Sequence, residues 1–271
     1  MLFSQRNSPI QNMMTDIYLQ NMLKKYRPVA DLVVFMTVWS EVNTLAQSWA
    51  GNYLNECTAS GSYSKGTAIK GGTDFDFFLS IKTECSNSLQ EIYENLFIFL
   101  SNKNLNPRKQ NVSVGMNLNG QKIDLVPGKK QPSIFSNDHS LYKFKQKTWT
   151  KTNVKIHIDH VRSSGRIDEI KLLKIWRYCQ KIDAQSFYLE LLVLEAFSNP
   201  FDFLITDLHS NFLKILDFIS SEIQTRTIQD PSNSANLLSD DLSIQEKKTI
   251  AQKASISAAK IRSGKISEVI W

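Results

Sequence analysis

Two carboxylates lie one residue apart in an otherwise apolar stretch, TDFDFFLSI, at residues 73–81. Alternate side chains of a β-strand point to the same face, so Asp74 and Asp76 would project together while Phe75 and Phe77 face the opposite way. Two like charges at this spacing raise the free energy of a folded chain unless a positive group lies between them. The stretch therefore predicts a strand that carries a cation-binding site.

A third carboxylate, Asp124, follows on the second strand of a predicted hairpin. The segments VSVGMNL and QKIDLVP flank the dipeptide Asn119-Gly120, which is typical of a two-residue turn. If this strand pairs with the strand of Asp76, the three carboxylates converge. Oxygen ligands of this kind suit Mg²⁺, and two such ions about 3.5–4 Å apart would clamp the attacking and leaving oxygens of a displacement at phosphorus. We therefore predict Asp74, Asp76 and Asp124 as ligands of two Mg²⁺ ions, with Mn²⁺ as an alternative.

A small polar turn precedes the carboxylates, in the stretch GSYSKGTAIKGG that begins at Gly61. Glycine lets the backbone approach a phosphate closely, and Ser62 offers a hydroxyl and an N–H. If a helix starts here, its N-terminus adds further donors. Lys65 and Thr67 are candidate contacts too, with a solvated Lys65 as the alternative. Alone, a D-x-D pair, a Gly-Ser turn or an Asp near a hairpin is usually structural, so the prediction rests on their order along the chain.

The composition excludes some classes of protein and favours others. The chain has 271 residues, enough for a sizeable core, and its net charge of +6 favours anionic partners such as nucleotides or nucleic acid. The longest apolar runs are too short to span a bilayer, and the opening MLFSQRNSPIQ does not resemble a signal peptide. Cys57, Cys85 and Cys179 have neither metal-ligand spacing nor a disulfide framework. We therefore expect a cytoplasmic location without membrane attachment.

The hydrophobic pattern divides the chain into two halves. In the first half, the predicted helices 12–25, 29–50 and 88–101 alternate with the predicted strands 52–59 and 74–81 and with the hairpin. After about residue 165 the pattern becomes helical, with candidate helices over 166–181, 186–197, 207–223 and 243–262.

The predicted fold class is α+β, in which a small mixed sheet carrying the three carboxylates packs against a C-terminal helical bundle. We expect residues 1–150 to hold the N-terminal helices and the catalytic core. Residues 151–271 then form the other wall of a ligand cleft between the two halves.

Taken together, these motifs resemble the polymerase-β-type nucleotidyltransferase superfamily. Its pattern of a Gly-Ser turn, a hydrophobic-D-x-D strand and a third Asp in a short strand stands here as Gly61-Ser62, TDFDFF and KIDLVP. Within it, the chain most resembles the branch that holds 2′–5′ oligoadenylate synthase, cyclic GMP–AMP synthase, the bacterial cGAS/DncV-like nucleotidyltransferases (CD-NTases) and the archaeal CCA-adding enzymes. The likeness covers about residues 55–240.

The resemblance extends to three later stretches. EIKLLKIWR is similar to a helix with a phosphate-binding lysine, which implies Lys174, although Lys171, Lys174 and Arg177 also fit a solvated stripe. SFYLELLVLEAF is similar to the next helix, whose leading serine touches the triphosphate and whose next residue lies by the base; these would be Ser186 and Phe187. DPSNSANLLSDDLS resembles the Asp-Pro segment that follows the helical core, although it lacks that segment's second proline.

Four other assignments keep two interpretations. His157 and Arg166, in TNVKIHIDHVRSSGR, either hold phosphates or belong to a basic surface face. Trp176 and Phe187 fit the hydrophobic core as well as a base-stacking platform.

The resemblance implies a template-independent, metal-dependent nucleotidyltransferase that uses (d)NTPs and releases pyrophosphate. For a bacterial member it implies a cyclic or linear oligonucleotide messenger that reports phage infection to a downstream effector protein. The alternatives are addition of nucleotides to a tRNA or other nucleic-acid end, and a catalytically silent nucleotide-binding regulator. Nucleoside triphosphates are the expected partners, and a nucleic acid is a further partner as acceptor or product.

Overall fold

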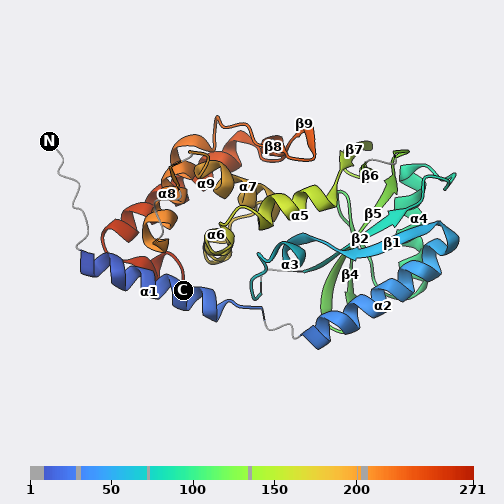
Figure 1. Ribbon diagram of the computed structural model, residues 1–271, viewed down its shortest axis with the longest axis horizontal. Coiled ribbons are helices and arrows are strands. Elements are labelled where there is room, and N and C mark those ends of the chain that lie inside the picture. The colour runs from blue at the N-terminus through green and yellow to red at the C-terminus, as the bar shows by residue number, and fades with distance from the viewer. Residues whose placement is uncertain (1–8, 29–31, 72–73, 134–135, 200, 203–206) are drawn as a thin grey trace.

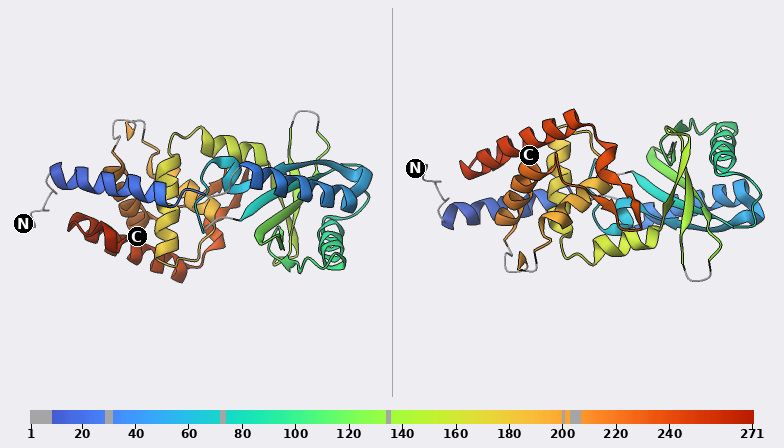
Figure 2. Two further views of the ribbon diagram at one scale, coloured as in Figure 1. Left: turned by 90° about the horizontal axis from the view of Figure 1, so that it is seen from below. Right: turned by 90° about the horizontal axis from the view of Figure 1, so that it is seen from above.

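The computed structural model describes residues 9–28, 32–71, 74–133, 136–199, 201–202 and 207–271. Two lobes lie side by side along the long axis, one built around a sheet and the other built mainly from helices (Figure 1). Views from below and above show the same elongated arrangement (Figure 2).

A mixed sheet forms the centre of the first lobe. Its main path runs in the spatial order β1 (Leu54–Ala59), β2 (Phe75–Ile81), β5 (Gln121–Lys130), β4 (Val114–Leu118) and β3 (Arg108–Lys109). From β5 the sheet continues into β6 (His139–Lys143) and β7 (Thr148–Thr152). β2 and β5 run parallel, and the other pairs are antiparallel. The predicted strands and the Asn-Gly hairpin are confirmed, whereas β6 and β7 were not foreseen.

Two helices cover one face of this sheet. α2 (Leu32–Ala50) and α4 (Leu89–Asn102) share a buried apolar cluster with Phe75, Phe77 and Leu79 of β2. α4 begins at a capping box formed by Ser88 and Glu91, which fixes its first turn. Because side chains alternate along a strand, Asp76 and Phe78 point to the opposite face, toward the short helix α3 (Gly61–Lys65) and the second lobe.

The second lobe is held together by its own apolar core. Trp176, Leu192, Phe212 and Ile250 are all buried in this core. α7 is apolar on nearly every side, as expected of a helix surrounded by other helices. The elements of the lobe are α5 (Val154–Arg162), α6 (Ile167–Cys179), α7 (Ser186–Ala196), α8 (Leu208–Glu222), α9 (Ile244–Arg262) and the hairpin of β8 (Gln229–Asp230) and β9 (Asn233–Leu237).

The first helix, α1 (Pro9–Lys25), packs on the second lobe although it precedes the sheet in sequence. Leu19 is buried in the core of that lobe, and the Tyr18 hydroxyl donates a hydrogen bond to the carbonyl of Ile270 at 2.9 Å. The predicted division of the chain near residue 150 remains a prediction. Helix α1 belongs to the first half of the sequence but packs on the helical lobe. The first three residues of the helix predicted over 29–50 lie outside the described residues.

The structure also bears on the membrane and cysteine predictions. Among the described residues, no helix combines the length and apolar character needed to cross a bilayer. Cys57, Cys85 and Cys179 are buried free thiols.

Candidate active site

The predicted carboxylates lie at one end of the β2–β5 pair. Asp76 and Asp124 are direct partners in the parallel register, and Asp74 immediately precedes β2. The condition set in the sequence analysis, that the D-x-D strand pairs with the second strand of the hairpin, is therefore met. Side chains of register partners project from the same face of a sheet, so Asp76 and Asp124 are neighbours on the face opposite α2 and α4.

This arrangement concentrates negative charge in a poorly hydrated place. Burial raises the pKa of Asp76 to about 7, and the charges of Asp124 and Asp74 add to the effect, against the opposing influence of Lys65 and Lys174. Burial and the charge of Asp74 also raise the pKa of Asp124. A divalent cation would relieve this repulsion, and carboxylate oxygens are the ligands that Mg²⁺ prefers.

The three carboxylates thus fit the predicted metal chemically, but their side chains are not yet arranged around one metal position. Within the residues that the structure describes, no three acidic, histidine or cysteine side chains already surround one metal position. The ligand roles of Asp74, Asp76 and Asp124 accordingly stay predictions.

Asp124 is held by a side chain that the sequence analysis missed. The Gln110 amide donates a hydrogen bond to Asp124 Oδ1 at 2.9 Å, and Gln110 Oε1 accepts one from the Ser113 hydroxyl at 2.7 Å. Gly115 lies opposite Asp124 on β4, where a Cβ would come within 2.9 Å of Asp124 Oδ1 and 2.8 Å of Gln110 Nε2. The absence of a side chain at Gly115 therefore makes room for the Gln110–Asp124 contact.

Gly61 lies against Asp76. Its φ is +61°, and a Cβ at this position would fall 1.8 Å from Asp76 Oδ2, so glycine is required on both counts. The backbone N–H of Ser60 donates to the carbonyl of Asp76 at 2.8 Å, which fixes the turn on the strand. Helix α3 does begin at Gly61, and Ser62 lies half-buried in its first turn. Their predicted contact with a phosphate remains a prediction.

Three other predicted nucleotide contacts are engaged inside the protein, around Glu190 of α7. Lys174 Nζ donates to Glu190 Oε1 at 2.6 Å, and Lys65 Nζ donates to Glu190 Oε2 at 2.9 Å. The Thr67 hydroxyl donates to Glu190 Oε1 at 2.7 Å and accepts from Lys174 Nζ at 2.8 Å. All four residues are buried, so α6 and α7 are joined to the segment that carries the Gly61 turn.

This buried network decides between the alternatives given for its two lysines, and the predicted nucleotide contacts of its members stay predictions. Burial alone would raise the pKa of Glu190, but the ammonium groups of Lys174 and Lys65 outweigh it and lower the pKa to about 2. The solvated alternatives are wrong, because Lys174 is 2% and Lys65 is 6% exposed. Thr67 and Lys174 are occupied by Glu190 in this arrangement, whereas Lys65 also lines the cleft described below.

The start of α7 places Ser186 and Phe187 near this network. The Ser186 hydroxyl accepts a hydrogen bond from Arg177 at 3.0 Å. Lys65 Nζ lies 3.8 Å from the centre of the Phe187 ring, a cation–π contact, and the His157 ring lies 4.5 Å from it. Phe187 is thus packed between side chains, and its predicted role beside a base stays untested.

The remaining two-way assignments are now resolved in part. Trp176 is fully buried and donates to the Ser257 hydroxyl at 2.9 Å, which confirms the core interpretation. His157 Nε2 contacts Asp230 at 2.7 Å and thereby fastens the Asp-Pro turn to α5. Arg166 pairs with Glu169 at 3.1 Å, so it is not a free surface cation.

A cleft of about 640 Å³ opens beside Asp76 and is lined by both lobes. The sheet lobe contributes Gly61, Phe78 and Gln110, and the helical lobe contributes residues of α5 and α7 and of the segment after β8. Residues of both lobes thus face this cleft, and its predicted role as the nucleotide site stays a prediction.

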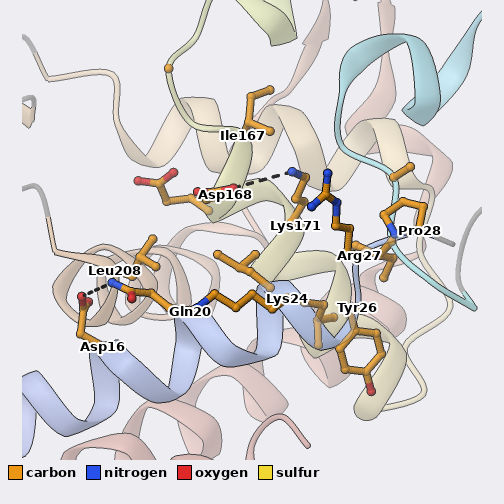
Figure 3. Close-up of a pocket in the computed structure, with 16 residues that line it drawn as sticks. Asp16, Gln20, Lys24, Tyr26, Arg27, Pro28, Ile167, Asp168, Lys171 and Leu208 are labelled. Atoms are coloured by element: carbon orange, nitrogen blue, oxygen red, sulfur yellow. Dashed lines mark hydrogen bonds and ion pairs between the residues drawn. The ribbon is translucent and has the colours of Figure 1, made fainter. Parts of the chain in front are cut away.

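A larger cavity of about 860 Å³ lies elsewhere, between α1 and α6 (Figure 3). Its charged side chains are of both signs, and Lys171 is paired with Asp168 at 3.7 Å. It holds none of the three predicted carboxylates. We therefore place the candidate site in the smaller cleft.

Two side chains that shape this site escaped the sequence analysis, Glu190 and Gln110. Glu190 left a signal, because an acid flanked on both sides by apolar residues, as in YLELLVL, requires a cationic partner when buried. Gln110 left none, since nothing in its neighbourhood distinguishes it from a surface glutamine.

Comparisons with known proteins agree on the fold. No protein-family profile and no curated protein matches the chain. Among solved structures, it is similar to Bradyrhizobium diazoefficiens CD-NTase CdnG in complex with GTP, with TM-score 0.72 and 10% identity over 96% of each chain. It is similar to E. coli MS115-1 CdnC in complex with HORMA-deltaN, with TM-score 0.71 and 15% identity over 94% of each chain.

A third similar structure is Elizabethkingia meningoseptica CdnE, a cyclic dinucleotide synthase with GTP and Apcpp. It matches with TM-score 0.62 and 16% identity over 91% of this chain and 97% of that one. The likeness in all three cases spans nearly the whole chain. The chain therefore has the CD-NTase fold, the α+β arrangement that its sequence predicted.

Proposed function

We propose that the protein is a metal-dependent nucleotidyltransferase that joins (d)NTPs without a template and releases pyrophosphate. The observation that carries this proposal is the parallel pairing of β2 with β5, which sets Asp124 beside Asp76, a residue that lines the cleft. The similarity to CdnG with GTP and to CdnE with two nucleotides supports the choice of a nucleoside triphosphate as substrate.

In this proposal Asp74, Asp76 and Asp124 hold two divalent cations, Mg²⁺ or Mn²⁺, which when bound neutralise phosphate charge and lower the pKa of the acceptor hydroxyl. Gly61 and Ser62 hold the donor triphosphate from the turn beside Asp76. The acceptor oxygen forms a bond to the α-phosphorus as the bond to pyrophosphate breaks. The protein contributes mainly positioning and electrostatic stabilisation.

The product we propose is a cyclic or linear oligonucleotide that acts as a messenger in bacterial anti-phage defence. A downstream effector protein would read it. The name of CdnE, a cyclic dinucleotide synthase, supports this choice of product class.

The test is to incubate the purified protein with each labelled NTP and dNTP and Mg²⁺ or Mn²⁺, with and without tRNA. A phosphatase-resistant small product indicates a cyclase, a ladder indicates a linear polymerase, and label on tRNA indicates end addition. Asp76→Asn should abolish turnover, whereas the matched control Asp217→Asn, a surface acid of α8, should retain it. Full activity of Asp76→Asn would refute the proposed site. Nucleotide binding without pyrophosphate release would favour a silent regulator.

A further inference from the structure

Two lysines on the cleft wall lack a carboxylate partner within the described residues. Lys143 ends β6, Lys145 lies in the turn that follows, and both line the cleft. The other lysines of the wall are neutralised by carboxylates, in the pairs Lys65–Glu190, Lys109–Glu94 and Lys151–Asp138. The positive charge that remains available to a ligand is therefore concentrated at the β6–β7 hairpin.

The hairpin as a whole is strongly basic. Residues 139–152 contain four lysines and not a single Asp or Glu. A potential of this sign attracts polyanions, and the cleft places it opposite the helical lobe rather than on an isolated surface.

The sheet face between the carboxylates and these lysines is apolar. Phe78 shares a face with Asp76 two residues away, and Leu141 likewise shares a face with Lys143. Phe78, Leu141 and Val126 of β5 all line the cleft between these polar ends. The order across this face is carboxylates, apolar floor and lysines.

A glycine makes room for the aromatic ring in this floor. A Cβ at Gly128 would fall 2.4 Å from Phe78 Cζ and 3.0 Å from Leu141 Cδ2, so the Phe78 ring occupies the space that a side chain would need. Because apolar surfaces of this kind accept the faces of nucleobases, the floor suits a base lying between the two polar ends.

We propose that the β6–β7 hairpin binds the phosphates of a linear single-stranded oligonucleotide, the acceptor or growing product, through Lys143 and Lys145. The order of groups on the wall matches the order in such a strand, with the 3′-hydroxyl toward Asp76 and Asp124, a base over Phe78, and phosphates at the lysines. The proposal rests on the nucleotidyl transfer proposed above. The donor triphosphate is assigned to the Gly61 turn, so the hairpin serves a second polyanion.

The test uses a short oligoadenylate with a 5′-fluorescein and a 3′-deoxy end that prevents its extension, titrated by fluorescence anisotropy at several salt concentrations. For the variant Lys143→Ala/Lys145→Ala we expect an affinity about 10-fold lower than for wild type. The slope of log K against log salt should fall in magnitude by about 1.4, because two phosphate contacts of a single strand are lost. The matched control Lys247→Ala/Lys248→Ala, on α9, should bind as wild type does. Binding of a donor NTP analogue should be unchanged in both variants.

Three results would overturn the hairpin site. These are wild-type affinity of the hairpin variant, an equal loss in the α9 control, and failure of the wild-type protein to bind the oligoadenylate at low salt. Pyrophosphate release from NTPs is measured in parallel to separate the two proposals. Oligonucleotide binding that depends on the hairpin but comes without pyrophosphate release would refute the transferase while supporting the strand site. Release without hairpin-dependent binding would do the opposite.

Discussion

Asp76 is a carboxylate whose surroundings favour its neutral form. Burial and two neighbouring carboxylates raise its pKa to about 7, and Gly61 leaves no space on one side of it. A group of this kind is costly to the metal-free protein and useful to a metal-bound one. Its titration can therefore be followed through stability, independently of any activity.

We expect the stability of Asp76→Asn relative to wild type to increase as the pH rises from about 4 to about 7. In the unfolded chain the pKa of an Asp is about 3.9, so the folded wild type binds this proton more tightly, and its free energy of unfolding falls over that range. The variant has no such titration, and the difference should reach on the order of 2–4 kcal/mol at neutral pH. Melting temperatures in EDTA measure it, with Asp217→Asn as the control. A difference that does not change with pH would contradict the assigned environment of Asp76.

A second prediction at this scale concerns the hydrogen bond from Gln110 to Asp124. A partner that orients a metal ligand typically changes metal affinity by about 10-fold or more when it is removed. We therefore expect Gln110→Ala to bind Mn²⁺ about 10-fold more weakly in a titration followed by electron paramagnetic resonance. Gln245→Ala, at an exposed position of α9, is the control. Unchanged Mn²⁺ affinity in Gln110→Ala would show that the contact does not orient a ligand.

At the scale of elements, α7 acts as the link between the lobes. Its acid Glu190 forms ion pairs with Lys65 of α3 and Lys174 of α6. Within the described residues, no carboxylate of the sheet lobe forms an ion pair with either lysine. A buried ion network of this kind gives little net stability over an apolar core, but removing one member leaves charges buried without a partner. The network therefore fixes how the Gly61 turn meets the helices.

Glu190→Ala should lower the free energy of unfolding by about 3–5 kcal/mol, because two buried ammonium groups lose their counter-charge. Glu195 lies on the same helix as Glu190, and Glu195→Ala, which removes a surface pair with Arg226, should cost about 1 kcal/mol or less. Urea denaturation of both variants compares the two costs. Equal costs would mean that the network is not what joins α7 to α3.

The sequence predicted elements with a strong local signal and failed where local signals conflict or distant contacts decide. The hairpin was predicted because its two-residue turn needs positive φ angles, which asparagine and glycine adopt readily. Asn119 and Gly120 have φ of +51° and +79°. Residues 154–162 alternate apolar and polar like a strand, yet they form α5, whose N-terminus is capped by the Asn153 side chain accepting from Ile156 N at 3.2 Å.

The same limit applies to the site. The D-x-D strand and Asp124 were recognisable because each belongs to a short local motif. The structure then shows that the two motifs lie on paired strands. Glu190 reaches Lys65 across 125 residues of sequence, and no spacing rule predicts such a partner. The sequence analysis therefore did not foresee that Lys174 and Thr67 contact Glu190.

At the scale of the whole molecule, residues from both ends of the described chain close the helical lobe. Tyr18 donates to the carbonyl of Ile270, and Tyr26 donates to that of Trp271 at 2.7 Å. Val269 and Ile270 are fully buried. These contacts tie α1 to the core formed by α6, α8 and α9.

Deleting residues 269–271 should destabilise the protein by about 3–6 kcal/mol, since two fully buried apolar side chains are lost. Trp271→Ala keeps the backbone carbonyl that accepts from Tyr26, so it should cost much less. Thermal denaturation of the two variants measures the difference. A deletion no worse than Trp271→Ala would show that Val269 and Ile270 contribute little to the lobe.

The position of α1 has a consequence for the order of folding. Tyr18 and Ile270 are 252 residues apart, so the helical lobe is discontinuous in sequence and the sheet lobe is inserted within it. Contacts across such a separation form slowly, because a long loop must close first. The inserted sheet lobe can fold before the helical lobe is complete. Its folding shortens the effective loop between α1 and the helices on which α1 packs. We therefore expect the strands that carry the carboxylates to form before α1 packs on α8 and on the residues beyond α9.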